Sequence, residues 1–163
     1  MDTPSLVRVD RFLALKRIAF IGVSRNPRDF SRGLFGEFLR RGYDVVPVNP
    51  AVETMDGLRC YRTVKAISPR VDGALVMAPK SALEKVIRDC ADAEIRQVWL
   101  YGLRGPKEFG SPTSDHCDEL NIEMIAGYCP YMFFPKTQFF HTMHGVVMKI
   151  MGSYPQRPKH HVA

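Results

Sequence analysis

The chain has 163 residues, of which 45% are hydrophobic and 25% charged, as expected for one compact globular domain with a sizeable core. No apolar run approaches the ~20 residues of a membrane span, and the first residues lack the basic-then-apolar profile of a signal peptide, so we expect a cytoplasmic protein. The formal net charge of +6 is scattered, without the interleaved aromatic residues of an RNA-binding sheet, and disfavours a nucleic-acid partner.

The first elements are predicted to be an amphipathic helix, a buried strand, a glycine turn and a second helix. Residues 5–15 carry apolar side chains at helical spacing, and the apolar run from Ile18 to Ile21 ends at Gly22. A polar turn and a helical pattern follow as far as Gly42, which stands where a glycine caps a helix. Such a turn offers backbone N–H groups to a phosphate. It lacks the full G-x-G-x-x-G, so a plain strand and helix is an equal alternative.

The chain continues to alternate strands and helices. Strands are predicted at 44–48, 71–77, 97–101 and 122–125, and helices at 64–67, 80–91 and 113–120. This alternation predicts an α/β fold, a Rossmann-like doubly wound five-stranded parallel sheet of order 3-2-1-4-5. Ligands of such folds bind at the carboxyl ends of the strands, where the turns at 22–28, 48–50 and 77–80 would surround one crevice.

The last segment departs from this rhythm. We expect residues 1–128 to form the Rossmann-like domain and residues 129–163 to add an aromatic- and Met-rich C-terminal helix packed on it. Side chains such as Phe139, Met143 and Val147 can line one side of that helix. Because such faces are adaptable, the helix covers the sheet or contacts a second subunit, and a homodimer through this segment is an open alternative.

The end of the second predicted strand discriminates between nucleotides. NAD-binding Rossmann folds place an acidic residue there, which accepts hydrogen bonds from the ribose hydroxyls. This chain has Asn49-Pro50 instead, and Arg25, Arg28 and Arg32 lie close to the first turn in sequence. A site that lacks the acid and has several arginines suits a ligand with extra phosphate. Both NADP and coenzyme A (CoA) meet this description.

At this point the chain resembles the CoA-binding domain family, the single-domain relatives of the nucleotide domain of the succinyl-CoA synthetase α subunit. The matching stretches are "IAFIGVSRNP", "GYDVVPVNP", "MDGLRCYRTVKAISPRVDGALVMAPKS", "VWLYG" and "IAGYCPY". The Val-Asn-Pro at 48–50, with the later Gly57-x-x-x-Tyr61, is the most specific part. The resemblance implies a protein that binds CoA or an acyl-CoA. The chain departs from the family at Val23, where a small residue is common, and at Tyr101, where Gln is common.

The resemblance also implies a site. The turn from Gly22 to Asn26 would hold the pyrophosphate, Asn49 and Pro50 would flank the adenosine, and residues 76–79 would line the crevice beside the pantetheine arm or adenine. Cations near the turn would offset phosphate charge, with solvated surface cations as the alternative. The candidate cofactor-binding residues are Gly22, Val23, Ser24, Arg25, Asn26, Arg28, Val48, Asn49, Pro50, Met77, Ala78, Pro79 and Lys80.

The sequence offers no recognisable catalytic set, neither a Ser/His/Asp order with supporting turns nor paired carboxylates in the predicted crevice. Cys129 is either a reactive thiol near the ligand's sulfur or a small buried hydrophobe. His141 and His144 share a helix face, but two histidines without a third ligand favour packing over metal binding. The four cysteines contain no C-x-x-C and are expected to be reduced.

Three functions are therefore compared. The preferred one is a CoA or acyl-CoA binding protein without identifiable catalytic residues. The alternatives are an NAD(P)-binding sensor or oxidoreductase-like protein, and an interaction subunit that uses its C-terminal helix.

Overall fold

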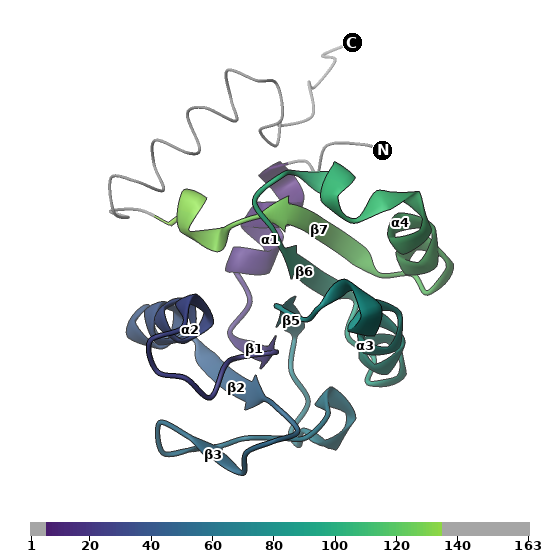
Figure 1. Cartoon of the computed structure of the whole chain (residues 1–163). Helices are drawn as coiled ribbons and strands as arrows, with labels where there is room; N and C mark the ends of the chain where they lie inside the picture. The colour runs from purple at the N-terminus through teal and green to yellow at the C-terminus, as the bar shows by residue number, and fades with distance from the viewer. Residues whose placement is uncertain (1–5, 135–163) are drawn as a thin grey trace.

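The structure is a computed structural model that describes residues 6–134, and its centre is a five-stranded parallel sheet (Figure 1). The strands in spatial order are β2 (Asp44–Val48), β1 (Arg17–Ile21), β5 (Gly73–Val76), β6 (Gln97–Tyr101) and β7 (Glu123–Tyr128). β1 is paired on both sides, so that Ala19 lies opposite Val46 of β2 and Ala74 of β5. The predicted fold class, an α/β fold with five parallel strands, is confirmed.

The order of the strands differs from the predicted order 3-2-1-4-5. Numbered along the chain within the main sheet, the observed order is 2-1-3-4-5, because β5 pairs with β1 instead of lying beyond β2. The outer edge of β2 is taken by Tyr61, whose N–H donates to the Pro47 carbonyl at 3.0 Å and whose carbonyl accepts from the Asn49 N–H at 2.9 Å. β5 is buried along its whole length and completes its pairing at the centre of the sheet, where both faces are covered.

Helices cover both faces of the sheet. α1 (Leu6–Leu13) and α2 (Phe30–Arg40) lie on one face, and α3 (Lys80–Asp92) and α4 (Gly110–Glu119) lie on the other (Figure 1). β1 shows why both layers are needed. Ile18 and Phe20 pack into the core on the α1–α2 side, whereas Ala19 and Ile21 pack into the core on the α3–α4 side. Successive side chains of a strand point to opposite faces, so an all-apolar strand must be covered twice.

The ends of the helices follow from local residues. α2 has Arg41 at its C-cap, and Gly42 follows with φ +86°, a left-handed conformation that glycine adopts without strain. The predicted cap is therefore confirmed. The helix predicted at 113–120 begins earlier, at Gly110, and Pro112 lies inside its first turn. A proline is tolerated there because the first N–H groups of a helix have no partner within the helix.

The loop after β2 contains a small hairpin. β3 (Thr54–Met55) and β4 (Leu58–Arg59) pair antiparallel around Asp56 and Gly57, which have φ values of +49° and +79°. Two consecutive positive φ values are typical of the tight turns that join hairpins, and Asp-Gly is a frequent sequence at such turns. The short 3₁₀ helices are η1 (Val64–Ala66), η2 (Pro106–Glu108) and η3 (Pro130–Met132).

The predicted C-terminal helix falls on residues 135–163, which lie outside the described residues. Up to residue 134 the chain packs on α2, where the ring of Phe134 lies 5.0 Å from the ring of Phe38 in an edge-to-face arrangement. The division of the chain at residue 128 and the homodimer through the last segment stay predictions.

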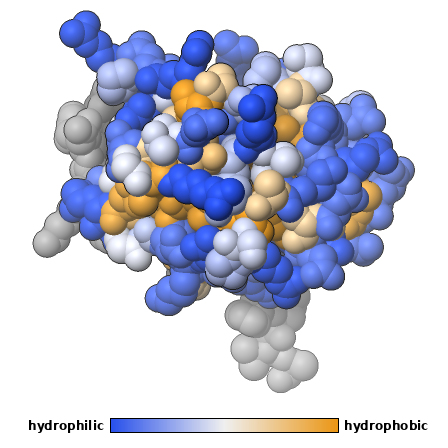
Figure 2. Space-filling view, turned by 90° about the horizontal axis from the view of Figure 1, so that it is seen from below, coloured by the Kyte–Doolittle hydropathy of each residue, from blue (hydrophilic) through white to orange (hydrophobic). Residues whose placement is uncertain are grey.

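Between residues 6 and 134, no helix has both the length and the apolar character needed to cross a bilayer. On the face seen from below in Figure 1, apolar side chains reach the surface in separate places among hydrophilic ones (Figure 2). Apolar atoms contribute a large share of the surface of any folded domain.

Candidate functional site

An apolar cavity of about 480 Å³ lies where the carboxyl ends of β1, β2 and β5 meet α3 and η1. Its lining residues are Ile21, Gly22, Val48, Pro50, Arg62, Thr63, Val64, Met77, Ala78, Pro79, Ala82, Lys85, Val86 and Asp89. The structure thus brings together members of all three predicted turns, namely Gly22, Val48 with Pro50, and Met77 to Pro79. The cavity lies at the edge of the sheet where parallel folds bind ligands.

Gly22 follows the last residue of β1 and lies against the backbone of Met77, which follows the last residue of β5. Its N–H donates to the Val48 carbonyl at 3.0 Å, and its φ is +87°. A Cβ at this position would lie 2.5 Å from the carbonyl oxygen of Met77, and that oxygen belongs to backbone that cannot move aside cheaply. Both the conformation and the close approach therefore require glycine here.

The turn after Gly22 is held by a chain of short polar side chains. The Ser24 N–H donates to Ser31 Oγ at 2.9 Å, the Asn26 N–H donates to Ser24 Oγ at 3.1 Å, and the Arg28 N–H donates to Asn26 Oδ1 at 3.0 Å. These local bonds fix the backbone of the turn without using a ligand. Val23 differs from its neighbours, because its side chain is fully buried in the core on the α1–α2 side.

Asp29 caps the helix end that the sequence offers to a phosphate. Its carboxylate accepts the Ser31 N–H at 2.8 Å and the Ser31 hydroxyl at 2.6 Å, and these hydrogen bonds lower the pKa of Asp29. An N-cap carboxylate satisfies the first N–H groups and the positive end of the helix dipole. The N-terminus of α2 therefore already has an anionic partner, so the turn itself is the remaining candidate for phosphate binding.

Arg32 contacts the carbonyl groups of the same turn. Its side chain is only 12% exposed, and its guanidinium is 3.4 Å from the carbonyl oxygens of Ser24 and Arg25. The same group pairs with Asp56 of the β3–β4 hairpin. Because the carbonyls of the turn face Arg32, the peptide N–H that follows each of them is directed the opposite way. Arg32 thus links the hairpin to the conformation of the turn.

The side chain of Asn49, the residue predicted to flank the adenosine, joins two turns. Its Nδ2 donates to the Val23 carbonyl at 2.8 Å, and its Oδ1 accepts the Ala51 N–H at 2.8 Å. Its carbonyl oxygen lies 3.7 Å from the sulfur of Cys60, a buried thiol whose pKa is raised by desolvation. Asn49 is thus half-buried between the first and second turns, and its neighbour Pro50 lines the cavity.

The predicted cations are not the ones that line the cavity. Arg25 and Arg28 are exposed on the first turn. Lys80 donates to the carbonyl of Glu108, a residue of η2, at 2.5 Å. The cations of the cavity are Arg62 and Lys85, which the sequence analysis missed. The available signal for Arg62 was its place directly after the Gly57-x-x-x-Tyr61 pattern, but no local pattern showed that it faces the cavity.

Asp89 is a buried carboxylate that lines the cavity. It accepts from Lys85 Nζ at 2.5 Å and pairs with Lys65 Nζ at 3.0 Å. Burial alone would raise the pKa of Asp89, but the hydrogen bonds from the two lysines outweigh it and lower the pKa. The group joins η1 to α3 and holds two ammonium groups beside the cavity.

The other chemical candidates lie in packed surroundings. Cys129 is fully buried, and desolvation raises the pKa of its thiol to about 12, so the buried-hydrophobe interpretation is supported over the reactive one. Tyr101 lies at the end of β6 with its ring 5.4 Å from that of Phe30. His116 on α4 has Nδ1 3.9 Å from Glu119. His141 and His144 lie outside the described residues, within which no cluster of three metal-binding side chains occurs.

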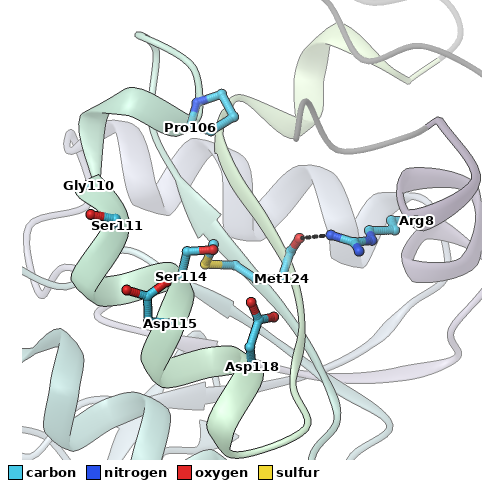
Figure 3. A pocket seen from close by; sticks show the side chains of 8 residues that line it. All are labelled: Arg8, Pro106, Gly110, Ser111, Ser114, Asp115, Asp118 and Met124. Carbon is cyan, nitrogen blue, oxygen red and sulfur yellow. Dashed lines mark hydrogen bonds between the residues drawn. The ribbon is translucent and has the colours of Figure 1, made fainter. Parts of the chain in front are cut away.

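A second hollow, of about 340 Å³, lies between α1, α4 and β7 (Figure 3). Figure 3 shows Asp118 of α4 and Arg8 of α1 on either side of Met124, whose carbonyl accepts from Arg8 at 3.5 Å. Asp115 adds a second carboxylate from the same helix. With its single arginine engaged and two acids on its wall, this hollow repels a phosphate-bearing ligand. It also lies away from the strand ends that the sequence indicated.

Comparison with known proteins decides the family. The model of the CoA binding domain matches residues 16–130. The chain belongs to this family. The resemblance drawn from the sequence is thereby confirmed, and the match extends over β1 to β7 and the cavity between them.

Curated relatives include much longer proteins. The α subunit of ADP-forming acetate–CoA ligase II from Pyrococcus furiosus is 30% identical over 91 residues, which are 55% of this chain and 20% of that protein. The chain thus spans about a fifth of the length of that ligase, and 17% of a second ADP-forming acetate–CoA ligase from Methanocaldococcus jannaschii. An uncharacterised protein of Bacillus subtilis, YneT, is 26% identical over 100 residues and is covered over 74% of its length.

Solved structures share the fold. A hypothetical protein from Pyrococcus horikoshii aligns with a TM-score of 0.68 at 22% identity, over 77% of this chain and 85% of that one. The dinucleotide-forming acetyl-coenzyme A synthetase 1 of Korarchaeum cryptofilum, in complex with phosphate and ADP, aligns with a TM-score of 0.65 at 22% identity, over 73% of this chain and 27% of that one. At these identities the likeness establishes a common fold.

Proposed function

We propose that this chain binds coenzyme A or an acyl-CoA at the carboxyl ends of β1, β2 and β5. The observation that carries the proposal is the apolar cavity of about 480 Å³ that opens beside the Gly22 turn. A cavity that is largely apolar, with a few polar groups at its rim, suits a ligand that has both apolar and phosphate parts. Membership in the CoA binding domain family supports CoA as that ligand.

The parts of the ligand are assigned by chemistry. The rigid turn from Gly22 to Asn26 is proposed to hold the pyrophosphate, with Arg25 and Arg28 exposed on the same turn to supply charge. Pro50 and the stretch 77–79 offer apolar walls to the adenine or the pantetheine arm. All four cysteines are buried thiols, as in proteins of reducing compartments, which supports our expectation that the protein works in the cytoplasm.

Isothermal titration calorimetry tests the proposal. We expect CoA or acetyl-CoA to bind with a dissociation constant of about 1–100 μM, and NAD and NADP to bind at least tenfold more weakly. If neither CoA nor acetyl-CoA binds below about 1 mM, the proposal is overturned. Stronger binding of NADP than of CoA would instead support the nicotinamide-nucleotide alternative.

A matched pair of variants on α3 places the ligand. Ala82 lines the cavity, whereas the preceding Ser81 is exposed and does not. Ala82→Phe fills part of the cavity and should abolish CoA binding, while Ser81→Phe should leave the affinity unchanged. Circular dichroism of both variants checks that each is folded. Equal affinity in the two variants would place the ligand elsewhere.

A further inference from the structure

Arg62 reaches the cavity from the segment that lies along the outer edge of β2. The preceding residue, Tyr61, forms a parallel bridge with Val48, and its carbonyl accepts the Asn49 N–H at 2.9 Å. Arg62 therefore directly follows a residue fixed beside the end of β2, and it lines the cavity together with Val48 and Pro50. The end of the second strand is the place where Rossmann folds recognise the ribose of a nucleotide.

Among the charged residues that line the cavity, Arg62 has no carboxylate partner within the described residues. These charged residues are Arg62, Lys85 and Asp89, and the Lys85 ammonium donates to Asp89 at 2.5 Å. Lys65 also pairs with Asp89, so this carboxylate is fully engaged. Arg62 is exposed at the rim and forms no ion pair with any residue from 6 to 134. The rim on the β2 side thus carries a net positive charge that no neighbouring carboxylate neutralises.

The chemistry of this position favours a phosphomonoester. A guanidinium presents a planar fork of donors that matches two phosphate oxygens, and an apolar wall beside it strengthens the attraction. The pyrophosphate is already assigned to the turn after Gly22, at the end of the neighbouring strand β1. A second phosphate near the end of β2 would therefore be the one on the ribose.

We infer that Arg62 binds the phosphomonoester on the ribose of the nucleotide, which in CoA is the 3′-phosphate. The inference rests on the proposed function for the identity of the nucleotide. The same chemistry occurs in the 2′-phosphate of NADP, so the experiment must separate the two sources. Arg62 is then a specificity-determining residue, which distinguishes CoA from ligands that lack the third phosphate.

The neighbouring Arg59 provides a matched control. It lies on β4, carries the same charge, and its guanidinium carbon lies 4.8 Å from the centroid of the Tyr61 ring. It does not line the cavity. A change in overall charge would therefore affect Arg59→Gln and Arg62→Gln alike, whereas loss of a specific phosphate contact would affect only the second.

The experiment is calorimetric titration of the wild type, Arg62→Gln, Arg62→Lys and Arg59→Gln with four ligands, namely CoA, dephospho-CoA, NADP and NAD. We expect the wild type to prefer CoA by about tenfold or more, since a charge-assisted contact to phosphate contributes about that much. Arg62→Gln should lower the affinity for CoA to that for dephospho-CoA, and leave dephospho-CoA binding unchanged. Arg62→Lys should retain part of the preference, and Arg59→Gln all of it.

The other outcomes separate the two proposals. If the wild type binds CoA and Arg62→Gln keeps the preference, or weakens both ligands equally, the inference about Arg62 is overturned while the proposed function stands. If the wild type does not bind CoA but binds NADP more tightly than NAD, the proposed function fails. In that case, loss of the preference for NADP in Arg62→Gln but not in Arg59→Gln would still support a contact between Arg62 and the ribose phosphate. If none of the four ligands binds, both proposals fail.

Discussion

The side-chain amide of Asn49 donates a hydrogen bond of 2.8 Å to the main-chain carbonyl of Val23. This bond ties the end of β2 to the turn after β1, across the mouth of the proposed site. At a position where other nucleotide-binding folds use an acid to contact the ribose, this chain uses an amide to hold its own backbone. The shape of the site therefore depends on a residue whose side chain is already engaged within the protein.

Asn49→Asp should lose that bond. A carboxylate can still accept the Ala51 N–H but cannot donate to the Val23 carbonyl, and the two oxygens would repel each other. We expect the free energy of unfolding to fall by about 2 kcal/mol, with weaker CoA binding because the two turns separate. Urea denaturation and calorimetry measure the two effects. Wild-type values for both would show that the bond does not support the site.

Gly22→Ala should be strongly destabilising, and Gly36→Ala should not. At Gly22 the φ of +87° and the 2.5 Å approach of a Cβ to the Met77 carbonyl act together, so a loss of about 3 kcal/mol is expected. Gly36 lies inside α2 with nothing within 4 Å of a Cβ, so alanine there should stabilise by up to about 1 kcal/mol. Thermal or urea unfolding of both variants measures the contrast, and equal effects would contradict it.

Asp89 should make stability depend on pH in the acid range. Its pKa is lowered in the folded protein by hydrogen bonds from Lys85 and Lys65, which outweigh burial. The contribution of Asp89 to the free energy of unfolding is therefore fully present above the pKa of about 3.9 that an aspartate has in the unfolded chain. It is lost as the pH falls through the lower pKa of Asp89 in the folded protein. Asp89→Asn should lose about 2 kcal/mol at pH 7 and show a flatter acid limb in urea titrations.

Asp92 serves as the control for this change. It also faces Lys65, at 3.6 Å, but its side chain is 54% exposed, and pairs of this kind contribute little. Asp92→Asn should therefore change the free energy of unfolding by less than about 0.5 kcal/mol, with the acid dependence of the wild type. If both variants behaved alike, burial of Asp89 would not be the reason for its effect.

The thiols should be unreactive in the folded protein. Desolvation raises the pKa of Cys90 to about 12, that of Cys117 to about 11 and that of Cys129 to about 12, so the nucleophilic thiolate is scarce at neutral pH. A disulfide exchange reagent at pH 7.5 should react slowly with the native protein and rapidly with all four thiols in denaturant. A fast native phase that disappears in Cys129→Ser would revive the reactive-thiol hypothesis.

Much of the fold was predictable because the burial and the backbone conformation of a short segment depend mainly on its own residues. The apolar runs at Ile18 to Ile21 and at 97–101 and the glycine at 42 each reflect burial or backbone conformation of a few consecutive residues, and all were confirmed. The family could be recognised for the same reason, since its motifs are short stretches whose residues are contiguous. The presence of a crevice at the strand ends followed from the alternation of strands and helices alone.

Three features depended on contacts between distant segments. β5 lies beside β1, Tyr61 occupies the outer edge of β2, and Asn49 reaches Val23 across two turns. Arg62 lines the cavity because its segment returns along β2, a path that no periodicity in residues 57–63 reveals. Spacing along the chain shows which face of an element is buried, but the partner of that face is set by long-range packing and hydrogen bonding. The Gly22 turn was therefore evident from sequence, whereas the cations that line the cavity beside it emerged only from the folded chain.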